Sequence, residues 1–214
     1  MVEAGFTMTP RRIGDMRRAL LRLARPDRRV TSLAFLDRHE LAALRAEADR
    51  QTYRTATPVI EHRGNRVRQD FEVCFPAPRT GAFARLAGLL ENSIMAASEG
   101  ARSLVTDLPV DLADFAIQRY PAGSAGIGIH RDGKRYRGIV VIVTLGGHSR
   151  LFTCDDRDGT NKRRIDDRPG RIVLLSAEGF AGREGEGARP LHGVDRVTGG
   201  RLSLGFRCGP AVAT

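Results

Sequence analysis

The stretch Asp114–Leu145, "DFAIQRYPAGSAGIGIHRDGKRYRGIVVIVTL", decides the fold of this chain. It contains three short apolar runs, and clusters of Pro, Gly and Asp separate each run from the next. Runs of this length, bounded by turn residues, predict β-strands. Because no helical pattern lies between them, we expect neighbouring strands to pair antiparallel, as in a barrel or a sandwich.

Strand patterns continue almost to the end of the chain. They occur in "RLFTC", "KRRID", "GRIVLLS", "RPLHGV" and "RLSLGFR", and pairs such as Pro169-Gly170 and Gly199-Gly200 separate them. Upstream, apolar residues at helical spacing predict helices in "RRIGDMRRALLRLA" and "GAFARLAGLLENSIMAA". A third helix is predicted after Asp37, because Glu40 completes a capping box. Gly64-Asn65 predicts the turn of an early β-hairpin.

These elements predict one domain over residues 1–214, mainly β with flanking helices (α+β). We expect a helical extension over 1–29, a substrate-side hairpin with bracing helices over 30–113, and a catalytic strand core over 114–208. The chain has 214 residues of which 41% are hydrophobic, so it can bury a substantial core.

Composition limits the possible environments and partners. No apolar run approaches the ~20 residues that span a bilayer, and the first residues lack the apolar segment of a secretory signal. The three cysteines form no CxxC pair, which indicates reduced core thiols in a cytoplasmic protein. The net charge of +10 favours a polyanionic partner such as nucleic acid. Only two of the basic residues are lysines, so GC-rich codon usage is the alternative source of this charge.

His130 and Asp132 stand two residues apart at the end of an apolar run. In a strand, residues i and i+2 point to the same side, so we expect both side chains to enter one space. Two histidines and one carboxylate on one face suit a hard divalent metal with open positions. Among the other histidines, His192 lies on a late predicted strand of the right type. If it is the third ligand, it should lie within about 5 Å of the other two side chains, since such ligand bonds are about 2 Å long.

The last predicted strand, "RLSLGFR", places Arg201, Ser203, Gly205 and Arg207 on one face. Two arginines directed into a barrel are costly unless an anion meets them. A cosubstrate with two carboxylates would explain both, because guanidinium groups bind carboxylates in a bidentate manner.

The ordered set H-x-D, a long gap, H and R-x-[NS]-x-x-x-R resembles the iron(II)/2-oxoglutarate dioxygenases, and its ending is similar to the AlkB branch. The resemblance covers roughly 114–207. It implies a double-stranded β-helix (jelly roll) braced by N-terminal helices, with Fe(II) held by His130, Asp132 and His192. It also implies that one of Arg201 and Arg207 holds each carboxylate of 2-oxoglutarate, and that O2 is the other cosubstrate. The remaining cosubstrate positions that it implies are Tyr120, Gln118 and Ser203, where the last two replace asparagines of the family pattern.

The same resemblance implies oxidative N-demethylation of a nucleic acid or nucleotide. An early hairpin often forms the substrate lid in this family. Candidate substrate contacts are therefore basic residues of the hairpin and residues just past the metal ligands: Arg63, Arg66, Arg68, Arg131, Lys134, Arg135 and Tyr136. The chain has no tryptophan, so base stacking would fall to Tyr53, Phe71 or Tyr136. Lys134 occupies the position of an acidic residue that reads the base edge in some members.

Three other interpretations stay open. The same chemistry could hydroxylate a small molecule, a free amino acid or a protein side chain. The protein could also be a basic jelly-roll binding module without catalysis, although the complete set of three metal-ligand candidates and two arginines argues against this. The hairpin arginines could simply be solvated. We also expect the adjacent Asp166 and Asp167 to be solvated.

Overall fold

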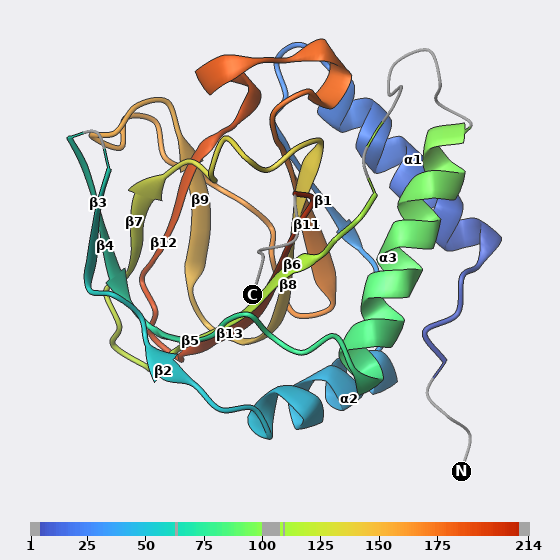
Figure 1. Ribbon diagram of the computed structural model, residues 1–214, viewed down its shortest axis with the longest axis horizontal. Coiled ribbons are helices and arrows are strands. Elements are labelled where there is room, and N and C mark those ends of the chain that lie inside the picture. Colours follow the sequence, from blue (N-terminus) through green and yellow to red (C-terminus); the bar gives the residue numbers. More distant parts are fainter. Residues whose placement is uncertain (1–4, 63, 100–107, 109, 210–214) are drawn as a thin grey trace.

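A computed structural model, which describes residues 5–62, 64–99, 108 and 110–209, shows two β-sheets packed face to face, with the helices along one outer side (Figure 1). Every strand pair within the sheets is antiparallel. The larger sheet has the order β1 (Val30–Ala34), β11 (Arg171–Ser176), β8 (Ile139–Gly147), β13 (Arg201–Arg207), β6 (Asp114–Tyr120), β5 (Glu72–Cys74) and β2 (Arg54–Thr55). The smaller sheet has the order β10 (Arg163–Arg164), β9 (Arg150–Cys154), β12 (Leu191–Asp195), β7 (Gly126–His130), β4 (Asn65–Asp70) and β3 (Val59–His62). The prediction of a mainly β jelly roll with flanking helices is confirmed.

The helices begin where the sequence provides caps. Helix α1 (Pro10–Ala24) follows Thr9, whose side chain accepts a hydrogen bond from the backbone N–H of Arg12. Helix α2 (Arg38–Asp49) starts at Asp37 with the predicted capping box, in which Glu40 returns a bond to the Asp37 backbone. Helix α3 (Gly81–Glu99) is the third helix, and two short 3-10 helices, η1 (Phe180–Gly182) and η2 (Gly185–Ala188), lie between β11 and β12.

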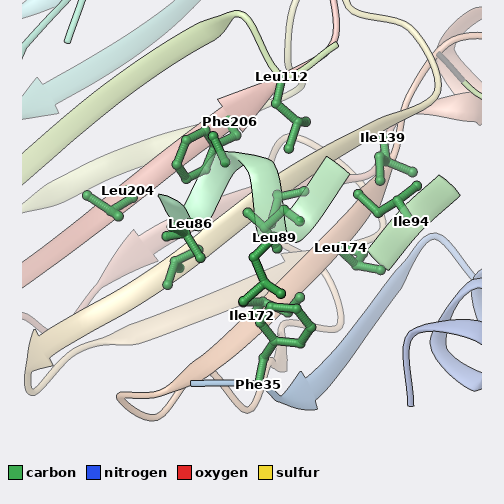
Figure 2. Close-up of a cluster of buried hydrophobic side chains, with 14 of the residues drawn as sticks. Phe35, Leu86, Leu89, Ile94, Leu112, Ile139, Ile172, Leu174, Leu204 and Phe206 are labelled. Atoms are coloured by element: carbon green, nitrogen blue, oxygen red, sulfur yellow. The ribbon is translucent and has the colours of Figure 1, made fainter. Parts of the chain in front are cut away.

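The main hydrophobic core lies between the larger sheet and the helices (Figure 2). One side of α3 contributes Leu86, Leu89 and Ile94, all of them buried. They pack against the sheet side chains that point toward the helices, such as those of Leu204 and Phe206 on β13. Truncating a buried leucine of this kind to alanine typically costs about 2–5 kcal/mol. The core therefore fixes which face of each strand turns toward the helices and which turns inward.

The alternate side chains of the larger sheet, which point away from the helices, enter the space between the two sheets. Tyr120, Val140 and Val173 of the larger sheet pack there against Leu151 and Val194 of the smaller one. On β13, Leu202, Leu204 and Phe206 point toward the helices. The residues between them therefore point into the space between the two sheets. The period of two thus directs the polar residues of β13 toward the interior of the sandwich.

Cys74, Cys154 and Cys208 are all free and buried, as expected for core thiols. In the part of the chain that the structure describes, no helix has both the length and the apolar character needed to cross a membrane.

Candidate metal and cosubstrate site

Two neighbouring strands bring the candidate histidines together. Strands β7 and β12 pair antiparallel with His192 directly opposite His130, and the two ring centroids are 4.3 Å apart. Gly126 makes this pairing possible at the start of β7. Its φ is +83°, and a Cβ there would lie 1.9 Å from the carbonyl oxygen of Val194. A glycine at this position therefore sets the close approach of the two ligand-bearing strands.

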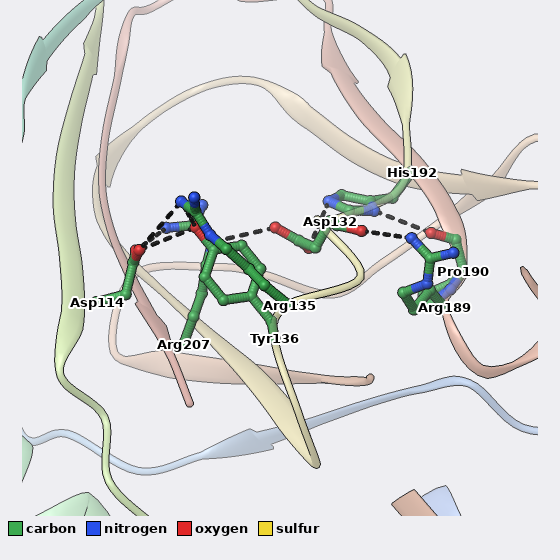
Figure 3. Close-up of polar contacts among 8 residues, drawn as sticks. All are labelled: Asp114, Asp132, Arg135, Tyr136, Arg189, Pro190, His192 and Arg207. Carbon is green, nitrogen blue, oxygen red and sulfur yellow. Dashed lines mark hydrogen bonds and ion pairs between the residues drawn. The ribbon is translucent and has the colours of Figure 1, made fainter. Parts of the chain in front are cut away.

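Asp132 lies in the loop just beyond β7, not within the strand as the i, i+2 argument assumed. It nevertheless reaches the histidines: its Oδ2 is 3.6 Å from Nε2 of His192 (Figure 3). The Nδ1 atoms of the two histidines face carbonyl oxygens, of Gly128 for His130 (2.9 Å) and of Pro190 for His192 (3.1 Å). Because a carbonyl can only accept, Nδ1 carries a proton in each ring, so in the neutral ring Nε2 is the nitrogen that can bind a metal.

The protonation states fit a divalent cation. Burial and the neighbouring His192 lower the pKa of His130 to about 4. Burial alone would raise the pKa of Asp132, but Arg207 and the histidines outweigh it and lower that pKa to about 2. At neutral pH, His130 is therefore a neutral ligand and Asp132 an anionic one. Two imidazoles and one carboxylate, with no further protein ligand, are the donor set of a hard metal with open positions. Among the described residues, no group of three or more His, Cys, Asp or Glu side chains is placed so that it could hold a metal ion, so the three candidates would have to move closer together to bind one.

The expected cosubstrate residues face one another across β6 and β13. Arg201 is opposite Tyr120, and Ser203 is opposite Gln118. With the three candidate ligands they line a small cavity between the sheets, here called the inner cavity, of about 40 Å³. A space of this size holds about one water molecule, so a larger molecule needs the lining side chains to move apart.

Arg201 is 3% exposed and already has protein partners. Its Nη1 pairs with Asp167 and donates to the Ser149 hydroxyl (3.1 Å), and its Nη2 donates to that of Thr144 (2.9 Å). Its Nε has no acceptor among the described residues. That orphaned donor fits an incoming carboxylate oxygen. The expectation that Asp167 is solvated is wrong: it is 5% exposed and balances the charge of Arg201.

Arg207 spans two protein carboxylates (Figure 3). Its Nε donates to Oδ1 of Asp132 (3.1 Å), and its Nη1 lies 3.3 Å from Oδ1 of Asp114. Asp114 is itself buried and accepts from the Tyr136 hydroxyl at 2.9 Å. Arg207 therefore contacts a candidate metal ligand directly, and its expected contact with 2-oxoglutarate stays a prediction.

A larger cavity of about 700 Å³, here called the outer cavity, opens beside the metal-ligand candidates. It shares Gln118, His130, Asp132 and Arg207 with the inner cavity. Four of the predicted substrate residues line it: Arg131, Lys134, Arg135 and Tyr136. An apolar wall comes from Ile60, Val67, Phe71, Val73 and Phe75.

The structure does not bring the hairpin arginines into this cavity. Asn65, Val67 and Gln69 of β4 line it, so the alternating Arg66 and Arg68 point to the other side. Arg66 pairs there with Glu61 at 2.8 Å, and Arg68 lines a second pocket. Arg63 lies outside the described residues.

The aromatic candidates for base stacking are separated. Tyr53 is outside the cavity lining: its hydroxyl donates to the Ala48 carbonyl, and Arg119 covers its ring at 4.0 Å. Phe71 and Tyr136 do line the cavity, but they are 5% and 8% exposed. Phe71 also packs on Tyr120, with ring centroids 4.8 Å apart. Stacking on any of the three rings would need a rearrangement.

Several cavity residues escaped the sequence argument. Asp114 could have been identified from the sequence, because it stands at even spacing from Gln118 and Tyr120 on one strand and so points to the same side. No sequence pattern identifies the cavity residues Arg54, Arg157 and Arg189. Each lies at the end of an element or in a loop, and only the folding of distant segments brings it to the cavity.

Comparison with known proteins supports the fold. No family model and no curated protein sequence matches the chain. Among solved structures it is similar to a Pseudomonas putida prolyl-4-hydroxylase (18% identity, 91% of this chain and 98% of that one, TM-score 0.59). It is also similar to OsALKBH1 (18%, 83% and 97%, TM-score 0.56). HygX from Streptomyces hygroscopicus, solved with nickel and 2-oxoglutarate bound, is a further match (15%, 97% and 89%, TM-score 0.58). The chain therefore has the jelly-roll fold of the iron(II)/2-oxoglutarate oxygenases.

Proposed function

We propose that this protein is an iron(II)- and 2-oxoglutarate-dependent dioxygenase. The observation that supports the proposal most is the convergence of His130, His192 and Asp132 beside a buried arginine with an orphaned Nε. In this proposal the three residues hold Fe(II), and Arg201, helped by Ser203, Tyr120 and Gln118, binds 2-oxoglutarate. The bound metal supplies oxygen activation, in which O2 and 2-oxoglutarate give succinate and CO2 while one oxygen atom goes to the substrate.

The protein's own part is to bind, orient and exclude water. The Nδ1–H groups of both histidines are fixed by backbone carbonyls, so the Nε2 lone pairs face the proposed metal position. Arg207 holds the Asp132 carboxylate in its anionic form. The buried apolar residues around the inner cavity, such as Val140 and Leu151, limit solvent access to the reaction.

For the substrate, we propose an anionic molecule, with a nucleic acid or nucleotide as first candidate and oxidative N-demethylation as the reaction. Three cations in the lining of the outer cavity, Arg54, Lys134 and Arg157, form an ion pair with none of the described residues. The wall beside them is apolar. Exposed cations next to an apolar wall suit a phosphate-bearing molecule with a flat, weakly polar group. Hydroxylation of an N-methyl group there would release formaldehyde from the resulting hemiaminal.

Hydroxylation of a peptide or a small molecule is the second candidate. It is favoured by the absence of a freely exposed aromatic ring among the described lining residues of the outer cavity. It is also favoured by the likeness to a prolyl-4-hydroxylase and to HygX, which has been solved with hygromycin B bound. Each of these candidates uses the same metal and cosubstrate residues.

The test is succinate release in the presence of Fe(II), 2-oxoglutarate and a panel of methylated nucleosides, oligonucleotides, peptides and metabolites, with products identified by mass spectrometry. We expect slow substrate-free succinate release, stimulated by one substrate class, and formaldehyde as a coproduct if a methyl group leaves nitrogen. His192→Ala should abolish succinate release while the protein stays folded by circular dichroism. Undiminished release by that variant would refute the metal assignment.

A further inference from the structure

Arg189 is a buried arginine at the point where η2 leads into β12, three positions before His192. It is 7% exposed. A guanidinium this deeply buried needs acceptors, because an unpaired buried charge is costly. Nη1 of Arg189 donates to the backbone carbonyl of Asp132 at 2.8 Å (Figure 3). Its Nε lies 3.4 Å from Oε2 of Glu178, an ion-pair contact in which neither atom makes a hydrogen bond with a described residue.

The contact with Asp132 joins the two segments that carry the candidate metal ligands. Asp132 sits in the loop after β7, where no strand pairing fixes the backbone. Arg189 belongs to the segment that continues into β12 and His192. A second bond runs in the reverse direction, since Nε of Arg131 donates to the carbonyl of Arg189 at 3.1 Å. Two side-chain-to-backbone bonds therefore hold the H-x-D loop against the segment before β12.

The other end of this connection is firmly anchored. Oε1 of Glu178 accepts a bond from the Gly185 N–H (2.6 Å), and the Glu178 backbone carbonyl accepts one from Gly138 (2.8 Å). Arg183, in the same segment, donates to the carbonyls of Leu23 (2.9 Å) and Arg25 (2.6 Å) at the end of α1. The guanidinium of Arg189 thus contacts a segment that is itself tied to the body of the protein.

We propose that Arg189, held by Glu178, is a positioning residue that sets the Asp132 backbone so that its carboxylate faces His192. This inference rests on the proposed function, because it assumes the metal site. Among the described residues, the Arg189 side chain forms no hydrogen bond or ion pair with either imidazole or with the carboxylate of Asp132, so it acts through the main chain. Its role is therefore distinct from that of Arg207, which contacts the carboxylate itself.

The test is nickel binding by the metal-free protein, measured by titration calorimetry. Loss of a residue that orients a ligand typically weakens metal affinity 10–100-fold. We expect Arg189→Met to show a loss in that range and to recover succinate release as Fe(II) is raised to saturation. Arg12→Met is the matched control. Arg12 pairs with the buried Glu40 at 2.5 Å beside α2, on the helical side of the larger sheet, so this variant also loses an ion pair and should keep the wild-type nickel affinity.

Because Arg189→Met leaves the Glu178 carboxylate without its ion-pair partner, the test includes the double variant Arg189→Met with Glu178→Gln, whose amide oxygen can still accept from the Gly185 N–H. Removing both charges of a buried pair together is often neutral for folding. The double variant should unfold near the wild-type temperature and still bind nickel at least tenfold more weakly. Wild-type nickel affinity in this folded variant would overturn the proposal for Arg189. A wild-type protein that binds no nickel at all would instead overturn the proposed function.

Discussion

Arg201 and Arg207 lie on the same face of β13, but their surroundings assign them different tasks. Arg201 shares its charge with Asp167 and two hydroxyl groups, and its Nε is left without an acceptor among the described residues. The guanidinium of Arg207 donates to two carboxylates, those of Asp132 and Asp114. Arg201 thus has a fully buried donor without an acceptor among the described residues, whereas the Nε and Nη1 of Arg207 are both engaged by protein carboxylates. We therefore assign the cosubstrate carboxylate to Arg201 first.

Replacing Arg201 by lysine tests this assignment with little disturbance of the fold. Lysine keeps the positive charge beside Asp167 but lacks the Nε–H and the planar fork. Removing a charge-assisted hydrogen bond to a buried carboxylate costs roughly 2–5 kcal/mol. The 2-oxoglutarate concentration that gives half-maximal succinate release should therefore rise at least about thirtyfold. The measurement is the 2-oxoglutarate dependence of succinate release at saturating Fe(II).

Arg201→Ala serves as the comparison, because it also leaves Asp167 as an uncompensated buried charge. We expect it to lose about 3–5 kcal/mol of unfolding free energy as well, which a thermal or urea unfolding experiment would show. An unchanged 2-oxoglutarate dependence in Arg201→Lys would refute the role of Arg201.

At the scale of elements, the hairpin β3–β4 acts as a two-sided wall. Ile60 and Val67 are paired directly across it and both line the outer cavity. Val59 and Arg68 form the adjacent pair and line the pocket on the opposite side. A period of two therefore separates cavity-facing from outward-facing residues over this hairpin.

Val67→Asp should place a charge in the apolar wall of the cavity. We expect substrate-stimulated succinate release to fall at least tenfold, since a carboxylate there removes part of the apolar wall and repels the proposed anionic substrate. Substrate-free release should stay within about twofold, because Val67 does not line the inner cavity, where the three candidate metal ligands and Arg201 meet. Val59→Asp makes the same chemical change on the outward side and should leave both rates near wild type. Equal losses in the two variants would show that the hairpin acts through its overall stability and not as a wall of the site.

The alternation of side chains along strands also explains which parts of this structure the sequence predicts. Alternation and capping signals located the helices and the strands, because each element buries one face against a continuous core. They also placed His130 and His192 on strands that turned out to be neighbours. Asp132 falls outside β7, because the strand ends before the ligand does.

Other features of the site depend on long-range packing that no local pattern carries. Asp167 is buried only because the fold brings it against Arg201. The family resemblance and the positive charge predict that the hairpin arginines contact the substrate, whereas alternation along β4 turns Arg66 and Arg68 away from the cavity. Arg189 comes near Asp132 only through the pairing of β7 with β12.

At the scale of the whole molecule, the question is whether the net charge of +10 serves binding or reflects composition. Arginines occur on many surfaces, including α1, where Arg11, Arg18 and Arg22 are exposed on the helical side of the larger sheet. Arg54, Lys134 and Arg157 instead gather around one cavity that also contains the candidate metal ligands. A charge that serves binding should be concentrated at the site, whereas a compositional charge acts equally from every surface.

Two triple variants, each lacking three positive charges, separate these explanations. Replacing Arg54, Lys134 and Arg157 by glutamine should weaken binding of a single-stranded oligonucleotide and lower its salt dependence by about two units of slope, at about 0.7 for each phosphate that is no longer neutralised. Replacing Arg11, Arg18 and Arg22 by glutamine lowers the net charge equally, but it should leave the slope almost unchanged, because the cations at the site persist. The measurement is the oligonucleotide dissociation constant over a series of salt concentrations. If both sets reduce affinity to the same extent, or if no binding occurs at low salt, the charge is compositional. Hydroxylation of a peptide or a small molecule then becomes the leading proposal, since the jelly roll, the candidate metal ligands and Arg201 do not depend on a nucleic-acid substrate.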